Sequence, residues 1–172
     1  MRTLRLKTYL AVLIVFSIGM LSSCKFYSMT GAQIEPEIKT MSVKYIANHA
    51  PLVNPLLSQE LTEAIKNRFI RQTSLDIVNR NGDLHFEGVI TGYSIRPIAI
   101  ASDQAAAQSR LTITVKINYT NTKYPEKDYQ QSFSRFADFD ATTSIQAAES
   151  EFIPQIITEL VDDIFNKAVV NW

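Results

Sequence analysis

The sequence contains one cysteine, two histidines, five glycines and six prolines among 172 residues. A single cysteine excludes a disulfide within the monomer and a zinc site built from several cysteines. The small number of glycines and prolines argues against a low-complexity, disordered chain. No apolar run reaches the roughly 20 residues of a membrane-spanning helix, since the longest covers about 13 residues, at 9–21. Stability must therefore come from a packed core.

The apolar run at 9–21 follows a basic start. The first seven residues, MRTLRLK, contain three cations and no acid. A basic start, a short apolar segment and small residues after it are typical of a secretory signal. The tetrapeptide LSSC at 21–24 follows, and it is similar to the lipobox of bacterial lipoproteins. That resemblance implies cleavage before Cys24, attachment of a diacylglycerol to its sulfur and N-acylation of the new amino terminus.

We therefore divide the chain into a cleaved signal peptide at 1–23, a lipidated tether at 24–37 and a folded domain at 38–172. The alternative is an ordinary signal cleaved near Ser23, which would leave Cys24 as a free thiol. Either cleavage removes three of the 17 cations and no acid, so 14 cations remain against 17 acids. This slight acidic excess does not provide the basic face that nucleic-acid binding requires.

The folded domain begins with a predicted strand and helix. Met41, Val43 and Tyr45 alternate with polar residues, which indicates a strand with these three on one face. After a loop with two prolines, Asn54 can cap a helix whose first residue is Pro55. The following residues show the spacing of an amphipathic helix, with apolar side chains at Leu57, Leu61, Ala64, Ile65 and Phe69.

A hairpin is predicted around Asn81-Gly82, a dipeptide that favours a type I′ turn. A two-residue turn there would pair Ile77 with Phe86 and bring their side chains to one face. The segment GVITG at 88–92 marks a bulge or a close backbone approach on the second strand.

The second half of the domain predicts two strands and a long helix. Alternation is clearest at 111–119, and a second strand follows at 129–140. The small residues at 99–109 predict a mobile hairpin tip or a short helical turn. Ser144 or a neighbour opens the last helix, and Pro154 places the start of its regular part at or near residue 154.

Two helices that each carry one apolar stripe must bury those stripes against one face of a sheet. The sequence therefore predicts an α+β fold, a two-layer sandwich with both helices on one face of a four- or five-stranded, mainly antiparallel sheet. The predicted core comes from both helices and the strand at 111–119: Leu57, Leu61, Ile65, Phe69, Leu111, Ile113, Val115, Ile156, Leu160 and Ile164.

The sequence shows no catalytic constellation. His49 lies in a prolyl loop and His85 on the polar side of a strand, positions typical of solvated histidines. The acids of DFD at 138–140 could bind a divalent cation, but two acids at a strand end favour a solvated loop. Nucleophile-elbow, Walker and dinucleotide-binding motifs are absent from the sequence. We predict a non-enzymatic protein without a metal or cofactor beyond its acyl groups.

Several segments together resemble the LptE family of lipopolysaccharide-assembly lipoproteins of the outer membrane. They follow the lipobox in order: VNPLLSQELTEAIKNRF, NGDLHFEGVITGYSIRPIAI, RLTITVKINYTNT, QSFSRFADFD and DDIFNKAVVNW. The resemblance implies the same sandwich and a lipid-anchored partner inside the LptD β-barrel. Such a partner stabilises barrel assembly and helps deliver lipopolysaccharide to the outer leaflet. Its implied location is the outer membrane, on the periplasmic side or within the barrel lumen, and Lys25 after the cysteine favours this sorting.

The candidate residues for contact with lipopolysaccharide and with the partner are chosen by their positions on the predicted strands and not by the resemblance. Arg96 and Arg110 flank the tip at 99–109 and are candidates for lipopolysaccharide contact. Val89, Tyr93 and Ile95 share the strand parity that cannot face the helices, so they are candidates for the partner surface. The alternative function is that of a generic periplasmic-face lipoprotein, which binds a small ligand or scaffolds an envelope complex.

Overall fold

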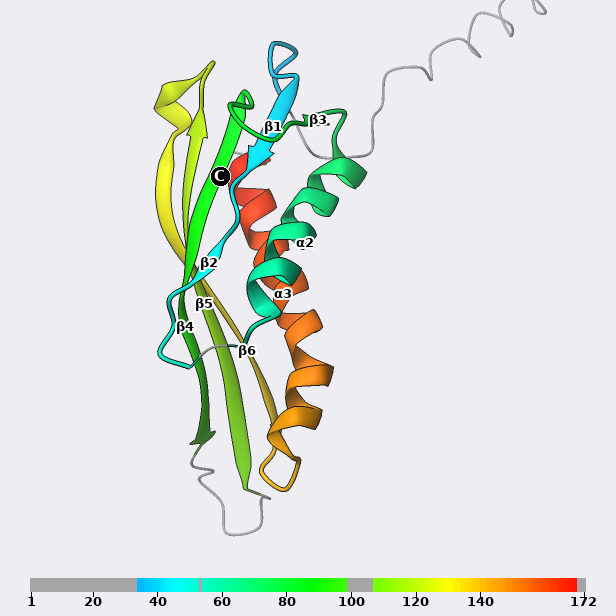
Figure 1. Ribbon diagram of the computed structural model, residues 1–172, viewed down its shortest axis with the longest axis vertical. Coiled ribbons are helices and arrows are strands. Elements are labelled where there is room, and N and C mark those ends of the chain that lie inside the picture. Colours follow the sequence, from blue (N-terminus) through cyan, green and yellow to red (C-terminus); the bar gives the residue numbers. More distant parts are fainter. Residues whose placement is uncertain (1–33, 53, 99–106, 170–172) are drawn as a thin grey trace, which may run out of the picture. The chain divides into compact units, whose positions relative to one another are not determined.

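The structure is a computed structural model that describes residues 34–52, 54–98 and 107–169. These residues form the predicted α+β sandwich, with two helices on one face of a sheet (Figure 1). The elements in chain order are β1 (Thr40–Val43), β2 (Ala47–Asn48), α2 (Leu57–Gln72), β3 (Asp76–Ile77), β4 (Leu84–Ile98), β5 (Gln108–Asn121), the 3₁₀ turn η1 (Pro125–Lys127), β6 (Tyr129–Asp140) and α3 (Ile145–Val169).

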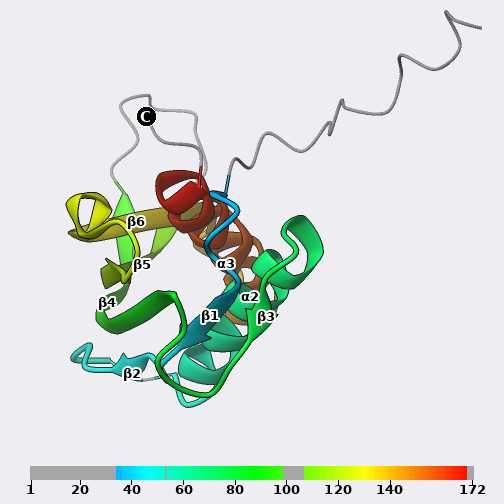
Figure 2. The same ribbon diagram turned by 90° about the horizontal axis from the view of Figure 1, so that it is seen from above.

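The sheet is mixed, and its strand order is β3-β1-β4-β5-β6, with β2 also paired to β4. The three long strands β4, β5 and β6 are antiparallel, as predicted. The short strands form a parallel arm, because β1 pairs in parallel with both β3 and β4, and β2 continues in parallel along β4. The sheet curves around the helices, so that α3 lies near β6 and α2 near β1 and β3 (Figure 2).

The hairpin predicted around Asn81-Gly82 is wrong. Ile77 pairs with Met41 of β1, and Phe86 pairs with Val43 of the same strand. Strand β1 therefore lies between the two strands that the turn was expected to join. Turn residues specify only a local change of direction, whereas the inserted strand comes from an earlier part of the chain.

The connection from β3 to β4 is fastened to β1. Asn81 adopts the positive φ of 56° that the turn signal predicts, whereas none of the glycines in the described ranges, at 82, 88 and 92, does so. Gly82 is required for another reason, since a Cβ there would lie 2.5 Å from β1 backbone atoms. The Asp83 carboxylate accepts hydrogen bonds from the backbone N–H groups of Lys39 at 2.9 Å and Thr40 at 3.0 Å. These bonds lower the Asp83 pKa to about 2, so the carboxylate that holds β1 stays ionised at neutral pH.

Helix α2 starts two residues later than the predicted cap at Asn54 places it. The Oδ1 atom of Asn54 accepts a hydrogen bond from the Leu56 backbone N–H at 3.0 Å. The regular helix then begins at Leu57, two residues after the predicted Pro55. Leu56 is thus the N-cap and has no side-chain cap, whereas Asn54 holds the turn that precedes the helix.

Helix α3 begins earlier than the proline rule predicts. It runs from Ile145, and Pro154 lies inside it. Ser144 is the predicted opening residue, and its Oγ accepts a hydrogen bond from the Ala147 N–H at 3.3 Å. Proline removes one helical hydrogen bond, but the turn before it buries Ala148 completely. The cap and this packing together retain the first helical turns, so the predicted start at residue 154 is wrong.

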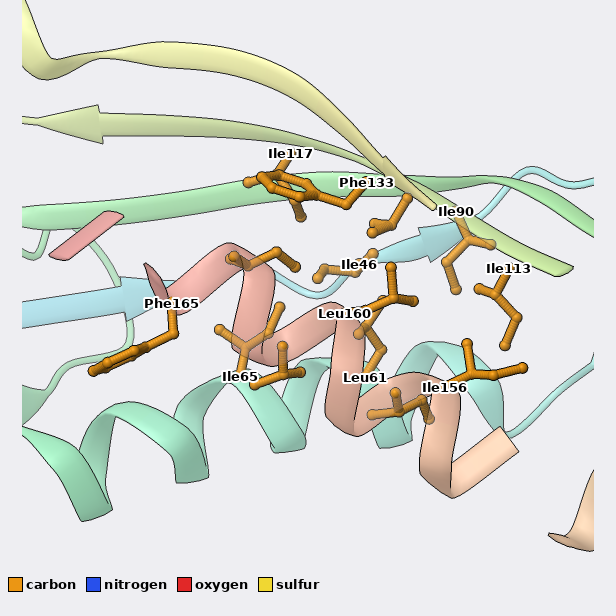
Figure 3. Packing of buried hydrophobic residues seen from close by; sticks show 14 of the residues in the cluster. Ile46, Leu61, Ile65, Ile90, Ile113, Ile117, Phe133, Ile156, Leu160 and Phe165 are labelled. Carbon is orange, nitrogen blue, oxygen red and sulfur yellow. The ribbon is translucent and has the colours of Figure 1, made fainter. Parts of the chain in front are cut away.

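The predicted core is confirmed, because every residue named for it is fully buried. Figure 3 shows buried side chains between the helices and the sheet, and five of the predicted residues are labelled among them: Leu61, Ile65, Ile113, Ile156 and Leu160. The core continues into an aromatic cluster, where the Phe69 ring lies 5.1 Å from that of Phe86 and 4.9 Å from that of Phe165, measured between centroids. One expectation at the first strand is wrong, since Tyr45 is 60% exposed and Ile46 is buried instead. The alternation stops at Val43, where β1 ends.

Candidate functional site

The face of the sheet opposite the helices, called the open face below, is mainly polar and uncharged. Strand pairing places three rows of side chains on it, with hydroxyl and amide groups predominating. Such a surface offers both donors and acceptors of hydrogen bonds. Its central members are Glu87, Val89 and Ser94 of β4, Thr112, Thr114, Lys116 and Asn118 of β5, and Gln130, Ser132, Ser134 and Phe136 of β6.

Of the three residues predicted for the partner surface, Val89 alone lies on the open face. The register between β4 and β5 shifts between Ile90 and Gly92, which is a β-bulge. One extra residue reverses the face of every later side chain, because side chains alternate along a strand. Tyr93 is therefore only 4% exposed, and Ile95 packs against the core. The segment GVITG signalled this bulge, but its effect on the residues beyond it was missed.

Tyr93 connects the sheet to α3. Its hydroxyl donates a hydrogen bond to a carboxylate oxygen of Glu149. Burial, followed by this carboxylate, raises the Tyr93 pKa well above its usual range, so the phenol stays protonated. A charged residue at position 93 would therefore destabilise the fold. Such a substitution cannot test whether the open face binds a partner.

A shallow depression of about 430 Å³ occupies the middle of the open face. Val89, Lys116 and the exposed side chain of Tyr45 are among the residues that line it. The Lys44 ammonium and the Glu87 carboxylate lie 3.2 Å apart along the same margin. The depression can accommodate a polar group of a partner or a small ligand.

His85 is held at both ring nitrogens, which the sequence did not predict. Its Nδ1 lies 2.7 Å from the Ser42 Oγ, and its Nε2 lies 3.2 Å from a Glu87 oxygen. The carboxylate can only accept, so Nε2 carries a proton, and in the neutral imidazole the Ser42 hydroxyl then donates to Nδ1. Ser42 is fully buried, and its oxygen already accepts the Gly82 N–H at 3.0 Å. The hydrogen bonds from Ser42 through His85 to Glu87 therefore join β1 to β4. Because Ser42 is buried, its hydroxyl is not accessible to a substrate.

The structure brings the two predicted lipopolysaccharide-contact residues together. Arg96 of β4 lies directly opposite Arg110 of β5 in the sheet register. Arg110 donates two hydrogen bonds to Asp138, at 2.7 and 2.8 Å, and its guanidinium stands 3.7 Å from the centroid of the Phe136 ring. Within the described ranges, Arg96 forms no ion pair. Asp138 and Phe136 were not predicted here, because their strand is distant in sequence. Most of the predicted tip, residues 99–106, lies outside the described part of the chain, and Gln108 and Ser109 already belong to β5.

The acids of the DFD segment do not form a metal site. The Asp138 carboxylate forms an ion pair with Arg110, whose hydrogen bonds lower the Asp138 pKa. Asp140 accepts hydrogen bonds from the Thr142 hydroxyl and backbone N–H. Throughout the described part of the chain, no group of three or more histidine, cysteine, aspartate or glutamate side chains could hold a metal ion.

The architecture defines a two-layer α+β domain with one sheet face covered by helices and the other face free. The family model for lipopolysaccharide-assembly proteins, LptE, matches residues 38–168. Because the match covers most of the chain, this protein belongs to the LptE family, and the resemblance found in the sequence is confirmed. The comparison with curated proteins found no match.

Solved structures share this fold at low sequence identity. Rare lipoprotein B from Shewanella oneidensis is 12% identical, with a TM-score of 0.52 over 74% of this chain and 92% of its own. The hypothetical protein CT253 from Chlamydia trachomatis is 9% identical, with a TM-score of 0.52 over 78% and 99%. A minor lipoprotein from Acinetobacter baumannii is 12% identical, with a TM-score of 0.50 over 76% and 91%. At these identities the similarity concerns the fold alone. Neither helix in the described ranges is long and apolar enough to cross a membrane.

Proposed function

We propose that this protein is a non-enzymatic lipoprotein, anchored in the outer membrane through acylated Cys24, that partners an LptD-type β-barrel. It would act there as a plug and assembly factor and support the transport of lipopolysaccharide to the outer leaflet. Membership in the lipopolysaccharide-assembly family is the observation that carries the proposal.

The polarity of the open face supports this partnership. The interior of an outer-membrane barrel is polar, whereas its lipid-facing exterior is apolar. The rows of hydroxyl and amide side chains on the open face can exchange hydrogen bonds with such an interior. We therefore centre the partner surface on Val89, Lys116 and Asn118, in place of Tyr93 and Ile95, which face the core.

Co-purification with the barrel tests the proposal. The full chain, co-expressed with the LptD-type barrel of its own cell, should be recovered with that barrel in a one-to-one complex. Val89→Asp should leave the fold intact, since Val89 is partly exposed, but reduce barrel recovery about tenfold or more. The reason is that the new carboxylate and the Lys116 ammonium directly opposite it would both have to leave water in the interface, and removing two charges from water is costly even when they pair.

Glu63→Lys is the matched control, because Glu63 is exposed on α2, away from the sheet. It reverses a charge and should leave barrel recovery unchanged. Loss of the barrel in Glu63→Lys but not in Val89→Asp would mean that the helices, and not the open face, meet the partner. Absence of the barrel from the wild-type preparation would refute the proposed function itself.

The arginine cluster should control the affinity for lipopolysaccharide phosphates. Arg96→Ala should lower that affinity about two- to fivefold, the range of an exposed ion pair. Asp138→Asn should raise it by a similar factor, because Arg110 then loses its counter-charge while the Phe136 ring still supports it. Binding of purified lipopolysaccharide at two salt concentrations measures both effects, since salt screens exposed charges.

Arg71→Ala is the control for this cluster, since it removes an exposed cation at the end of α2. It should not change lipopolysaccharide binding. If Asp138→Asn weakens binding, Arg110 does not contact phosphate, and the ion pair with Asp138 is needed only to hold the strands.

The alternative, a generic periplasmic-face lipoprotein that binds a small ligand, finds support in the depression beside Tyr45. The same co-purification separates the two functions. A small-ligand protein would be recovered without a barrel, and Val89→Asp would then affect ligand binding alone.

A further inference from the structure

The two edges of the sheet are unequal. One edge is formed by the two-residue strands β3 and β2 and, beyond them, by the second half of β4; the other is formed by β6, a strand of 12 residues. Strand β6 keeps an unbroken register with β5 along its length. Short edge strands, bulges, prolines and lysines are the usual protection of a sheet edge. The first edge is protected by the shortness of β3 and β2, by the bulge of β4 and by Pro97, whereas β6 contains no bulge, proline or lysine.

Specific backbone groups of β6 face outward. Residues of an antiparallel pair alternate between hydrogen-bonded and non-hydrogen-bonded positions. The Ala141 N–H donates to the Ala107 carbonyl, and the Ser134 hydroxyl reaches the Ile113 carbonyl, so the odd-numbered residues form the bonded pairs with β5. The even-numbered residues therefore direct their N–H and C=O groups away from the sheet: Gln130, Ser132, Ser134, Phe136 and Asp138.

A groove runs beside this edge, between β6 and α3. It measures about 470 Å³ and is lined by Gln131, Ser132 and Ser134 from β6 and by Asp163, Asn166 and Lys167 from α3. Figure 2 shows β6 and α3 next to each other at this end of the sheet.

An ion pair joins the two sides of the groove, and other polar side chains of α3 are exposed beside it. Arg135 donates two hydrogen bonds of 2.6 Å to Asp163, so its charge is directed toward α3 and not over the edge. Asn166 and Lys167 are exposed. Within the described ranges Lys167 forms no ion pair, and its Nζ lies 5.8 Å from the centroid of the Tyr129 ring. These two side chains can therefore bind a carboxylate or an amide.

We infer that the β6 edge binds an extended strand of the barrel partner, which adds to the sheet by backbone hydrogen bonds. This inference rests on the proposed function. Backbone N–H and C=O groups in a row recognise another extended backbone, and the pockets beside them select its alternate side chains. The bound strand has acidic or amide side chains toward Asn166 and Lys167. Because a closed barrel wall has no free strand edges, this strand comes from a loop or terminal segment of the partner.

Proline at residue 132 tests the inference in the full chain. Ser132→Pro removes an outward N–H and leaves the bonds with β5, an arrangement that edge strands tolerate. We expect a normal thermal unfolding curve but about tenfold lower recovery of the LptD-type barrel. Ser132→Ala is the matched control, since it removes the hydroxyl, keeps the N–H, and should retain full recovery.

Amide hydrogen exchange supplies an independent measurement on the wild-type complex. The even-numbered amides Ser132, Ser134 and Phe136 should exchange rapidly in the free protein and slowly with the barrel bound. The odd-numbered amides of β6 should exchange slowly in both states, because they bond to β5.

The outcomes separate the two ideas. If the barrel is recovered equally with Ser132→Pro and the even-numbered amides stay unprotected, the strand inference is overturned while the proposed function stands. If the wild-type chain recovers no barrel, both are overturned. If Ser132→Pro changes the oligomeric state and not the barrel yield, β6 pairs with a second copy of this chain, and the inference is overturned.

Discussion

Replacing Cys24 with alanine should release the protein from the membrane. Each buried methylene group of an acyl chain contributes about 0.8 kcal/mol, so two or three long chains hold a protein at the membrane almost permanently. Without the thiol no diacylglycerol can be attached, and cleavage before residue 24 should also fail. Fractionation of cells into membrane and soluble parts, with mass spectrometry of the mature amino terminus, measures both effects.

Ser28→Ala is the matched control, because it changes a small residue of the predicted tether without removing the thiol. It should remain acylated and membrane-bound. A Cys24→Ala protein that is still cleaved and still sediments with membranes would contradict the lipobox interpretation. A wild-type chain that is cleaved near Ser23 and carries a free thiol would support the alternative of an ordinary secretory signal.

Truncation of Leu160 should produce the largest loss of stability. Leu160 is fully buried and projects from α3 into the space between the helices and the sheet (Figure 3). Leu160→Ala should lower the free energy of unfolding by about 2–5 kcal/mol, the cost of lost apolar contact and of the remaining cavity. Leu61→Ala on α2 should have an effect in the same range, since Leu61 is equally buried. Denaturant unfolding of the full chain measures both.

Ile70→Ala is the control for these substitutions, because Ile70 lies on α2 but is 53% exposed. Its effect should stay within about 0.5 kcal/mol. If Leu160→Ala and Leu61→Ala are as mild as Ile70→Ala, the two helices do not pack on the sheet as the structure has them.

The helices and the core were predictable because their signals are local. Leu57, Leu61, Ile65 and Phe69 recur at the helical period, so one face of α2 is apolar whatever surrounds it. The alternation at 111–119 likewise assigns a buried and a polar face to β5. The turn before α2 is local as well, since Asn54 accepts its hydrogen bond from the backbone N–H two residues later. These features are determined by residues within a few positions of one another.

The candidate site was only partly predictable, because it combines strands that are distant in the chain. The sequence placed Arg96 and Arg110 on either side of one tip, and their pairing across β4 and β5 follows from that proximity. It could not show that Asp138 neutralises Arg110, since β6 is positioned only when the sheet forms. The same holds for His85, whose partner Ser42 comes from β1.

The sequence by itself determined the two amphipathic helices, the long alternating strands and the resulting two-layer sandwich, because periodicity decides which face of each element is apolar. Only the tertiary structure decided that β1 lies between β3 and β4, that the bulge turns Tyr93 inward, and that α3 continues through Pro154. In each of these cases a long-range contact outweighs a local preference. The energy of packing and strand pairing depends on residues that meet only in the folded chain.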